Sequence, residues 1–196
     1  FVVFFIAIVI GVVSSEGDIG FVRLILGDSY VNMTQENIKN DDPLAVYKKM
    51  NGIDMFMGIT FNNIRVSFYA FLAGIFLSVG TILLLIYNGI MLGTFHHLFY
   101  TKDLLFKSLS IVWIHGTLEI SSIIIAGAAG LVLGNSILFP KTYSRRQSFL
   151  IASKDGVKII IGLIPLFITA GFLESFVTRY TQMPILINMF IILSSF

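Results

Sequence analysis

The chain has 196 residues, of which 56% are hydrophobic and only 12% are charged. Because a soluble domain typically carries roughly 25% charged residues, this composition excludes a soluble fold. The net charge is +2 and the basic residues are scattered, so we expect no nucleic-acid partner, which would require a clustered basic face. The chain has no cysteine, which excludes a disulfide framework and thiolate chemistry.

Apolar residues gather in continuous blocks, and one block runs from Val66 to Phe95 without an acid or a base. About 20 such residues cross a bilayer as a helix, whereas a membrane barrel requires strands that alternate between apolar and polar residues. We therefore predict an all-α fold, a polytopic transmembrane helical bundle. About six hydrophobic segments are expected, at residues 1–14, 59–79, 81–100, 109–137, 156–178 and 182–196.

The expected organisation has three parts. Residues 1–14 form a transmembrane segment that begins in mid-span, so we expect the chain to be truncated at its start. Residues 15–57 form an extracytoplasmic segment, and residues 58–196 form the helical bundle, which includes a cytoplasmic loop at 138–157. The apolar stretch that ends near residue 100 is too long for one crossing, so we expect a tight turn in it near Ser78.

The extracytoplasmic segment is polar and mostly acidic, but apolar residues recur in it at helical spacing. The spacing favours short amphipathic helices on the membrane surface, and the second of them is expected to begin at residues 41–43. A solvated connecting loop is the alternative. The apolar positions form two groups: Phe21, Leu24 and Ile25, then Leu44, Tyr47 and Met50.

Orientation follows from the distribution of basic residues. Cytoplasmic loops of membrane proteins carry an excess of lysine and arginine, so we place the loop at 138–157 in the cytoplasm. Counting crossings backward then places the acidic segment 15–57 outside. The basic residues in and beside the loop are Lys141, Arg145, Arg146, Lys154 and Lys158.

Ionisable residues also occur inside the apolar segments. His115 and Glu119 are four residues apart, so both lie on one face of a helix. Counted at about 1.5 Å per residue from a helix start near residue 109, Glu119 would lie near the middle of the bilayer. A charge there costs about 2.5 to 3.5 kcal/mol on insertion scales, so it should face the bundle and have a partner. Candidate partners at the same level are Asn62, Asn63, Arg65, Glu174 and Arg179.

Three interpretations of this polar intramembrane network stay open. The first is a structural clamp that fixes how three helices pack. The second is a metal site at His115, Glu119 and Glu174, because one histidine and two carboxylates are a ligand set of zinc hydrolases. The third is a proton-linked or ligand-binding pocket that uses changes in protonation. The adjacent His96 and His97 are expected to be anchors at the membrane interface rather than ligands.

Small residues repeat in two G-x-x-x-G motifs, from Gly89 to Gly93 and from Gly130 to Gly134. Such motifs let helix backbones approach closely, and Gly116 is expected to contribute to helix packing as well. We expect these contacts to lie within the chain, with a homodimer as the alternative.

Several short motifs occur in one order along the chain: NNIRV at 62–66, FLAG at 71–74, NGIMLG at 88–93, HGTLE at 115–119, AGAAGL at 126–131 and ESFVT at 174–178. Over roughly residues 40–180, this order resembles the stage II sporulation protein M family. The resemblance implies that the functional positions and further motif residues are His115, Gly116, Glu119, Glu174, Asn62, Asn63 and Asn88.

The founding member of that family is a membrane component of a cell-wall remodelling machine, which acts with peptidoglycan-degrading partners as a scaffold. By resemblance, we predict a non-enzymatic membrane scaffold or assembly component of a bacterial cell-envelope complex, with several crossings of the inner (cytoplasmic) membrane. Its expected partners are the lipid bilayer and other membrane or envelope proteins. The alternative is an intramembrane metal-dependent hydrolase or a proton-linked transporter centred on His115, Glu119 and Glu174. No cofactor is predicted, and zinc at that cluster stays open.

Overall fold

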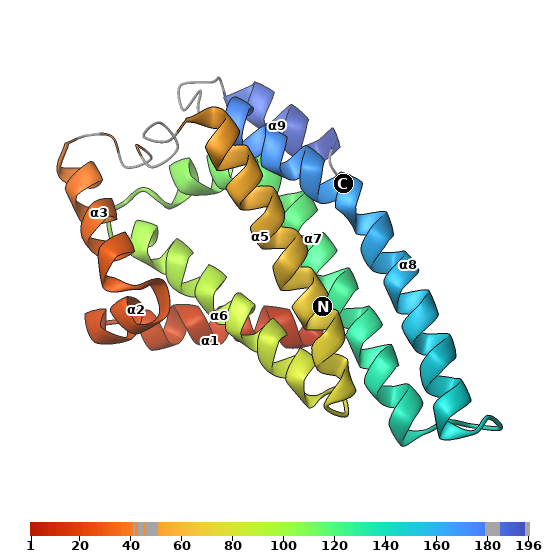
Figure 1. Ribbon diagram of the computed structural model, residues 1–196. Helices are drawn as coiled ribbons and strands as arrows, with labels where there is room; N and C mark the ends of the chain where they lie inside the picture. The colour runs from red at the N-terminus through yellow and green to blue at the C-terminus, as the bar shows by residue number, and fades with distance from the viewer. Residues whose placement is uncertain (41, 43–44, 46–50, 179–184, 195–196) are drawn as a thin grey trace.

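The computed structural model describes residues 1–40, 42, 45, 51–178 and 185–194. All regular structure in these residues is helical, which confirms the predicted all-α fold (Figure 1). In chain order, the elements are α1 (Val2–Ser15), α2 (Ile19–Leu26), α3 (Asp28–Lys39), α5 (Gly52–Leu72), the 3₁₀ turn η1 (Ala73–Ile75), α6 (Val79–Tyr100), α7 (Leu105–Leu138), α8 (Arg145–Phe172), the π-helical turn η2 (Leu173–Val177) and α9 (Ile185–Ser194).

Among the described residues, three helices are long and apolar enough to cross a membrane, namely α6, α7, and α8 together with η2. α1 is equally apolar but shorter, with 14 residues. α7 has 34 residues, about 51 Å at 1.5 Å per residue, so it must tilt in the roughly 30 Å of hydrocarbon or extend beyond it. The protein is therefore a helical membrane bundle, while the number of crossings stays a prediction.

α8 begins well before its apolar stretch. The Ser144 hydroxyl accepts a hydrogen bond from the backbone N–H of Gln147 at 3.3 Å and so satisfies one of the donors that a helix start leaves unpaired. With this cap in place, the helix includes the basic residues that follow Arg145. The loop expected at 138–157 is therefore mostly helical, and only residues 139–144 connect α7 to α8.

The polar segment 15–57 contains helices as well. α2 begins behind Asp18, whose carboxylate accepts a hydrogen bond from the backbone N–H of Phe21 at 3.0 Å, and this helix was expected. α3, which the sequence did not indicate, follows directly after Gly27, a residue that glycine suits because its φ is +84°. The amphipathic helix expected over residues 41–50 lies outside the described residues, apart from 42 and 45. We call α2 and α3 together the N-terminal arm.

α5 and α6 are joined by a tight turn at the place where the sequence predicts one. Leu77 and Ser78 take left-handed φ values of 54° and 70°, which non-glycine residues rarely adopt. The Ser78 hydroxyl donates a hydrogen bond to the carbonyl oxygen of Leu131 on α7 at 3.1 Å. Gly134 lies against the same turn, because a Cβ added there would come 2.3 Å from the Ser78 backbone nitrogen. The turn is thus held on the second half of α7.

α1 packs along α6 through three glycines, which we call the α1–α6 seam: Gly11, Gly89 and Gly93. A Cβ added at Gly89 would lie 2.8 Å from the carbonyl oxygen of Phe4, and one at Gly93 would lie 2.2 Å from that of Ile8. Both contacts advance by four residues in the same direction, so the two helices run parallel. The first G-x-x-x-G motif therefore serves packing within the chain, as expected.

The second G-x-x-x-G motif brings α7 against the end of α5. A Cβ added at Gly130 would lie 2.5 Å from the carbonyl oxygen of Ala70, and one at Gly74 of η1 would lie 2.0 Å from the carbonyl oxygen of Gly130. Large apolar side chains fill the space beside this contact, between α5, α7 and α8. They include Phe71, Ile123, Leu133, Ile160, Leu163 and Phe167.

Candidate polar site between three helices

A cluster of ionisable side chains lies where α7 meets α5 and the end of α8. His115 and Glu119 come from α7 and Glu174 comes from η2, and one nitrogen or oxygen atom of each lies within 4.8 Å of the others. Asn63 of α5 contacts Glu119. His115 is only 3% exposed, and both glutamates are partly buried. We call these residues, together with Thr178, the polar site.

The polar site lies well away from the α5–α6 turn. Glu119 precedes Leu131, which contacts that turn, by twelve residues, or about 18 Å along α7. Because α7 begins at Leu105 rather than near residue 109, Glu119 lies about 21 Å from the helix start instead of the 15 Å expected. The site is therefore in the half of the bundle where α7 begins and α8 ends.

The hydrogen bonds of Thr178 favour one tautomer of His115. The Thr178 hydroxyl donates to the carbonyl oxygen of Leu173 at 3.2 Å, which leaves its oxygen to accept from the His115 ring, whose Nδ1 lies 3.2 Å away. This arrangement places the ring proton on Nδ1. Nε2 presents its lone pair at 3.7 Å from Glu174 Oε1. Two acceptors thus face each other, and a proton or a cation between them is needed to make the contact favourable.

A side chain of α5 holds Glu119 in place. The Asn63 side-chain amide donates a hydrogen bond from Nδ2 to Glu119 Oε1 at 2.5 Å. A carboxylate has two oxygens with about four lone-pair sites, so this bond leaves the second oxygen available to another donor or to a cation. Because an unpartnered buried charge is costly, the Asn63 contact is one that stabilises Glu119 inside the bundle.

The π-helical turn η2 presents two side chains to α7. The backbone N–H of Thr178 donates to the carbonyl oxygen of Leu173, five residues back, at 2.8 Å. Single π turns within α-helices are rare and occur frequently at functional sites. Here Glu174, within the turn, and Thr178, directly after it, both contact His115.

Other predicted members of the network lie elsewhere. Arg65 donates from Nη2 to Asn62 Oδ1 at 3.0 Å, and both side chains are exposed, since Asn62 points about 100° away from Asn63 around α5. Asn88 donates to a carbonyl oxygen of its own helix at 2.8 Å. Arg179 lies outside the described residues. The structure thus brings only one of the three predicted α5 residues to the polar site.

Gly116 does not show the close helix contact that we expected. It is buried, but among the residues whose positions are described, an added Cβ would meet only Ile120 and Val112 of α7 itself, at 3.8 and 3.9 Å. These are ordinary van der Waals distances, in contrast to those at Gly89, Gly93 and Gly130.

Tyr30 of α3 is a neighbour of the polar site that the sequence did not indicate. The pKa of its hydroxyl is raised to about 12, chiefly by burial and to a smaller extent by the negative charge of Glu174, while a hydrogen bond with Thr34 acts in the opposite direction. The ring also packs on Phe95, with 6.3 Å between ring centroids. No local pattern reveals this electrostatic link, because Tyr30 and Glu174 lie in distant parts of the chain.

Two buried hydroxyl groups flank the polar site. Ser122 follows Glu119 by three residues and Ser67 follows Asn63 by four, so each shares a helix face with a member of the site. Both serines are 0% exposed, and within the described part of the chain neither hydroxyl has a hydrogen-bond partner. Their helical spacing was the signal that could have identified them.

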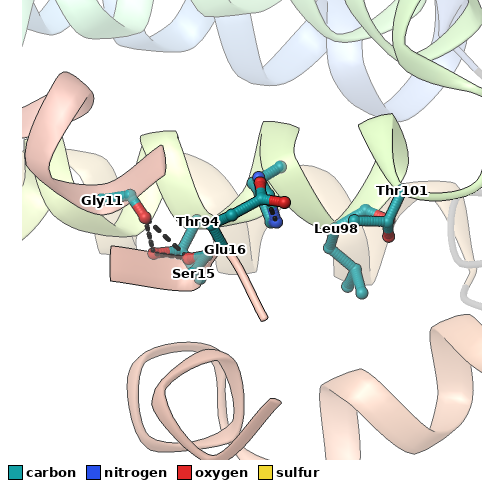
Figure 2. A network of polar contacts seen from close by, with 7 residues as sticks. Gly11, Ser15, Glu16, Thr94, Leu98 and Thr101 are labelled. Carbon is teal, nitrogen blue, oxygen red and sulfur yellow. Dashed lines mark hydrogen bonds and ion pairs between the residues drawn. The ribbon is translucent and has the colours of Figure 1, made fainter. Parts of the chain in front are cut away.

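A second polar cluster lies at the end of the α1–α6 seam (Figure 2). The Ser15 hydroxyl donates to the carbonyl oxygen of Gly11 at 2.7 Å, and the Thr94 hydroxyl oxygen lies 3.2 Å from it. His97 is only 3% exposed, with its Nε2 3.7 Å from the Glu16 carboxylate, and it borders an open cleft of about 240 Å³. The prediction that His97 is an interface anchor was therefore wrong, because it is buried between helices.

Comparison with known families agrees with the motifs in the sequence. The family described as Stage II sporulation protein M matches residues 1–179. No curated protein and no solved structure matches the chain. The family match begins at α1, includes the N-terminal arm and contains every residue of the polar site. Since it covers nearly the whole chain, the protein belongs to the stage II sporulation protein M family.

Proposed function

We propose that this protein is a non-enzymatic scaffold or assembly component of a bacterial cell-envelope complex, located in the inner (cytoplasmic) membrane. Family membership supports a membrane role of the sporulation type, and the resemblance suggests a complex that remodels peptidoglycan. The observation that carries the proposal is the N-terminal arm, a folded polar surface on an otherwise apolar bundle.

The N-terminal arm packs on α6 through a small core of its own. Val22 and Val31 are buried against Leu98, and an ion pair of 2.9 Å between Arg23 and Asp28 joins α2 to α3. The opposite side of α3 is exposed and polar at helical spacing, and we call it the α3 face. It consists of Ser29, Asn32, Glu36 and Lys39. A helix held in this way offers a water-soluble partner a preformed surface, which lowers the entropic cost of binding.

The two ends of the bundle differ in charge, which supports an orientation. The N-terminal arm lies toward one end, and the α7–α8 connection at 139–144 lies toward the other (Figure 1). Basic residues gather around the connection, at Lys141, Arg145 and Arg146. Because lysine and arginine are retained in the cytoplasm, we place the connection there and the N-terminal arm on the extracytoplasmic side.

Single-cysteine labelling tests this orientation directly, since the chain has no cysteine of its own. Ser29 on the α3 face and Thr142 in the connection are both exposed. We expect a membrane-impermeant maleimide added to intact cells to label the variant Ser29→Cys. The variant Thr142→Cys should react only after the membrane is opened. Reversed labelling would place the N-terminal arm in the cytoplasm and remove the proposed docking surface.

Cross-linking in the native host tests whether the α3 face binds a partner. A photoreactive amino acid at Asn32 is expected to give a defined adduct, whereas the same group at the exposed Tyr143 should not give that adduct. Glu36→Arg, on the same face, should abolish the adduct while the helix content of the protein stays unchanged. An adduct that survives this charge reversal would argue against docking on the α3 face.

A variant of the polar site distinguishes the proposed scaffold from the alternative, an enzyme or a transporter. A scaffold predicts that Glu119→Gln retains the Asn32 adduct, and that host envelope function is lost only where stability or the adduct is lost. If Glu119→Gln abolishes envelope function while the adduct and the thermal stability are those of wild type, the protein carries out chemistry at the polar site and the scaffold proposal fails.

A further inference from the structure

We propose that the polar site binds one divalent transition-metal ion, Zn²⁺, through His115, Glu119 and Glu174. The three residues come from two helical elements and converge in space, with one potential ligand atom of each within 4.8 Å of the other two. In a tetrahedral zinc site, bonds of about 2.0 to 2.1 Å place neighbouring ligand atoms roughly 3.3 Å apart. His115 Nε2 and Glu174 Oε1 are already at 3.7 Å, so small side-chain rotations complete the geometry.

The histidine is prepared for a metal by its second nitrogen. Metal-binding imidazoles usually donate their other ring N–H to an acceptor, which fixes the tautomer and the ring orientation. His115 meets this requirement, because Thr178 gives its own proton to Leu173 and accepts from Nδ1 at 3.2 Å. The lone pair of Nε2 is then directed toward the Glu174 carboxylate.

Glu119 is prepared in the same manner. Asn63 holds one carboxylate oxygen with a hydrogen bond of 2.5 Å, and the other oxygen remains for a metal. Carboxylate ligands of metals are commonly hydrogen-bonded in this way. Both supporting residues, Asn63 and Thr178, therefore hold a ligand without taking the atom that the metal would use.

A cation would also balance the charge of the polar site. Two carboxylates lie close together among apolar helices, and in the described ranges neither forms an ion pair with a lysine or an arginine. A divalent ion would neutralise both. The buried Ser122 hydroxyl, which shares the α7 face with Glu119 and has no hydrogen-bond partner in the described part of the chain, is a second polar group that bound water would satisfy.

One nitrogen and two oxygen donors suit zinc and the neighbouring divalent transition metals better than calcium or magnesium, which prefer all-oxygen sites. Three protein ligands leave a fourth position for water or for a ligand from a partner. A bound ion would also link α7 to the end of α8, which would stabilise a scaffold as well as an enzyme. The inference therefore does not depend on the proposed function.

The test measures the metal bound to the purified protein. The protein is purified through an affinity tag that contains no histidine, so that the tag itself binds no metal. We expect about one Zn²⁺ per chain in wild type, and bound Co²⁺ to give the visible absorption of a tetrahedral site that Zn²⁺ displaces. Glu119→Gln and Glu174→Gln should lose the ion, while Asp54→Asn, which changes an exposed carboxylate near the start of α5, should retain it.

A second pair of variants keeps the test decisive if a ligand variant does not fold. Thr178→Val removes the acceptor for His115 Nδ1 and is expected to weaken metal affinity by about 10-fold to 100-fold. Thr169→Val removes an exposed hydroxyl from α8 and should leave the affinity unchanged. The polar site is not a metal site if wild-type protein binds neither Zn²⁺ nor Co²⁺, or if the two threonine variants bind metal with equal affinity. Either result would leave the proposed docking on the α3 face unaffected.

Discussion

The α1–α6 seam and the polar site are both buried contacts between apolar helices, but they are built from opposite kinds of residue. In the seam, glycines such as Gly93 bring backbone atoms of two helices together. In the polar site, His115, Glu119 and Glu174 meet through side chains at defined distances. The seam depends on the absence of side-chain atoms, and the polar site depends on their presence.

The difference indicates where function is to be sought. Small residues join membrane helices by van der Waals contact without burying a charge. An ionised carboxylate at the bilayer centre costs about 2.5 to 3.5 kcal/mol on insertion scales. Since the seam shows that this chain packs helices without ionisable residues, the two glutamates of the polar site are the candidates for a role beyond packing.

Filling the seam should have the largest effect on stability. In Gly93→Leu, the new side chain collides with the Ile8 carbonyl oxygen, which is 2.2 Å from the position of Cβ. We expect a loss of about 3 kcal/mol in the free energy of unfolding, followed through the single Trp113 in detergent. Gly162→Leu is the control, because a Cβ there meets nothing within 4 Å in the described structure. Equal losses in both variants would show that helix contact at the seam is not the cause.

Removing a hydrogen bond from the polar site should have the next largest effect. Asn63→Leu leaves Glu119 without its amide donor, and we expect a loss of about 2 kcal/mol, as for hydrogen bonds to charged groups. Asn62→Leu is the matched control on the exposed face of α5. A chemical denaturation series in one detergent compares the two. If the neighbouring asparagines behave alike, Glu119 does not depend on Asn63.

The hydrogen bonds of Ser15 at the end of the seam should contribute less to the free energy of unfolding than the bond between Asn63 and Glu119. Ser15→Ala removes a hydroxyl that bonds to Gly11 and lies 3.2 Å from Thr94, and hydrogen bonds between membrane helices are worth about 1 kcal/mol. The neighbouring Ser14→Ala, which is half-buried, should change the unfolding free energy by less. A loss as large as that of Asn63→Leu would contradict the contrast between the seam and the polar site.

The smallest expected effect is a pH dependence at Tyr30, which links the N-terminal arm to the polar site. Its pKa is raised from 10.0 to about 12 in the folded protein, first by burial. Below pH 10 both states keep the proton. As the pH rises toward 12, the unfolded state loses it first, so the stability contribution is lost in that window. From pH 9 to pH 10.5 we expect Tyr30 to account for a decline of about 0.8 kcal/mol.

Thermal unfolding of Tyr30→Phe across the same pH range measures the contribution of Tyr30 to this decline in stability. The variant should lack that part of the decline, whereas Tyr143→Phe, at an exposed tyrosine, should keep the wild-type profile. Identical profiles for wild type and Tyr30→Phe would mean that Tyr30 is not held in its buried position.

The fold could be predicted to the extent that it depends on neighbouring residues in the chain. Continuous apolar runs in a bilayer must satisfy their backbone hydrogen bonds internally, so they form helices. The same local geometry placed His115 and Glu119 on one face. Helix boundaries were less accurate, because caps such as Ser144 extended helices into polar sequence.

The identity of the contacts depended on how the helices are rotated and brought together. Of the adjacent Asn62 and Asn63, the second faces Glu119 because α5 is turned so that Ala70 meets Gly130 of α7. Equivalent contacts turned His97 inward and left Gly116 without a close neighbour among the described residues.

The sequence by itself thus determined an all-α membrane bundle, a turn near Ser78, and a histidine and a glutamate on one helix face. Only the tertiary structure decided that, of the candidate partners, Glu174 and Asn63 meet this pair while Asn62 and Arg65 do not, and that Tyr30 feels the charge of Glu174. The physical reason is that helical periodicity relates residues within a few turns, whereas contacts between helices depend on packing across the whole bundle.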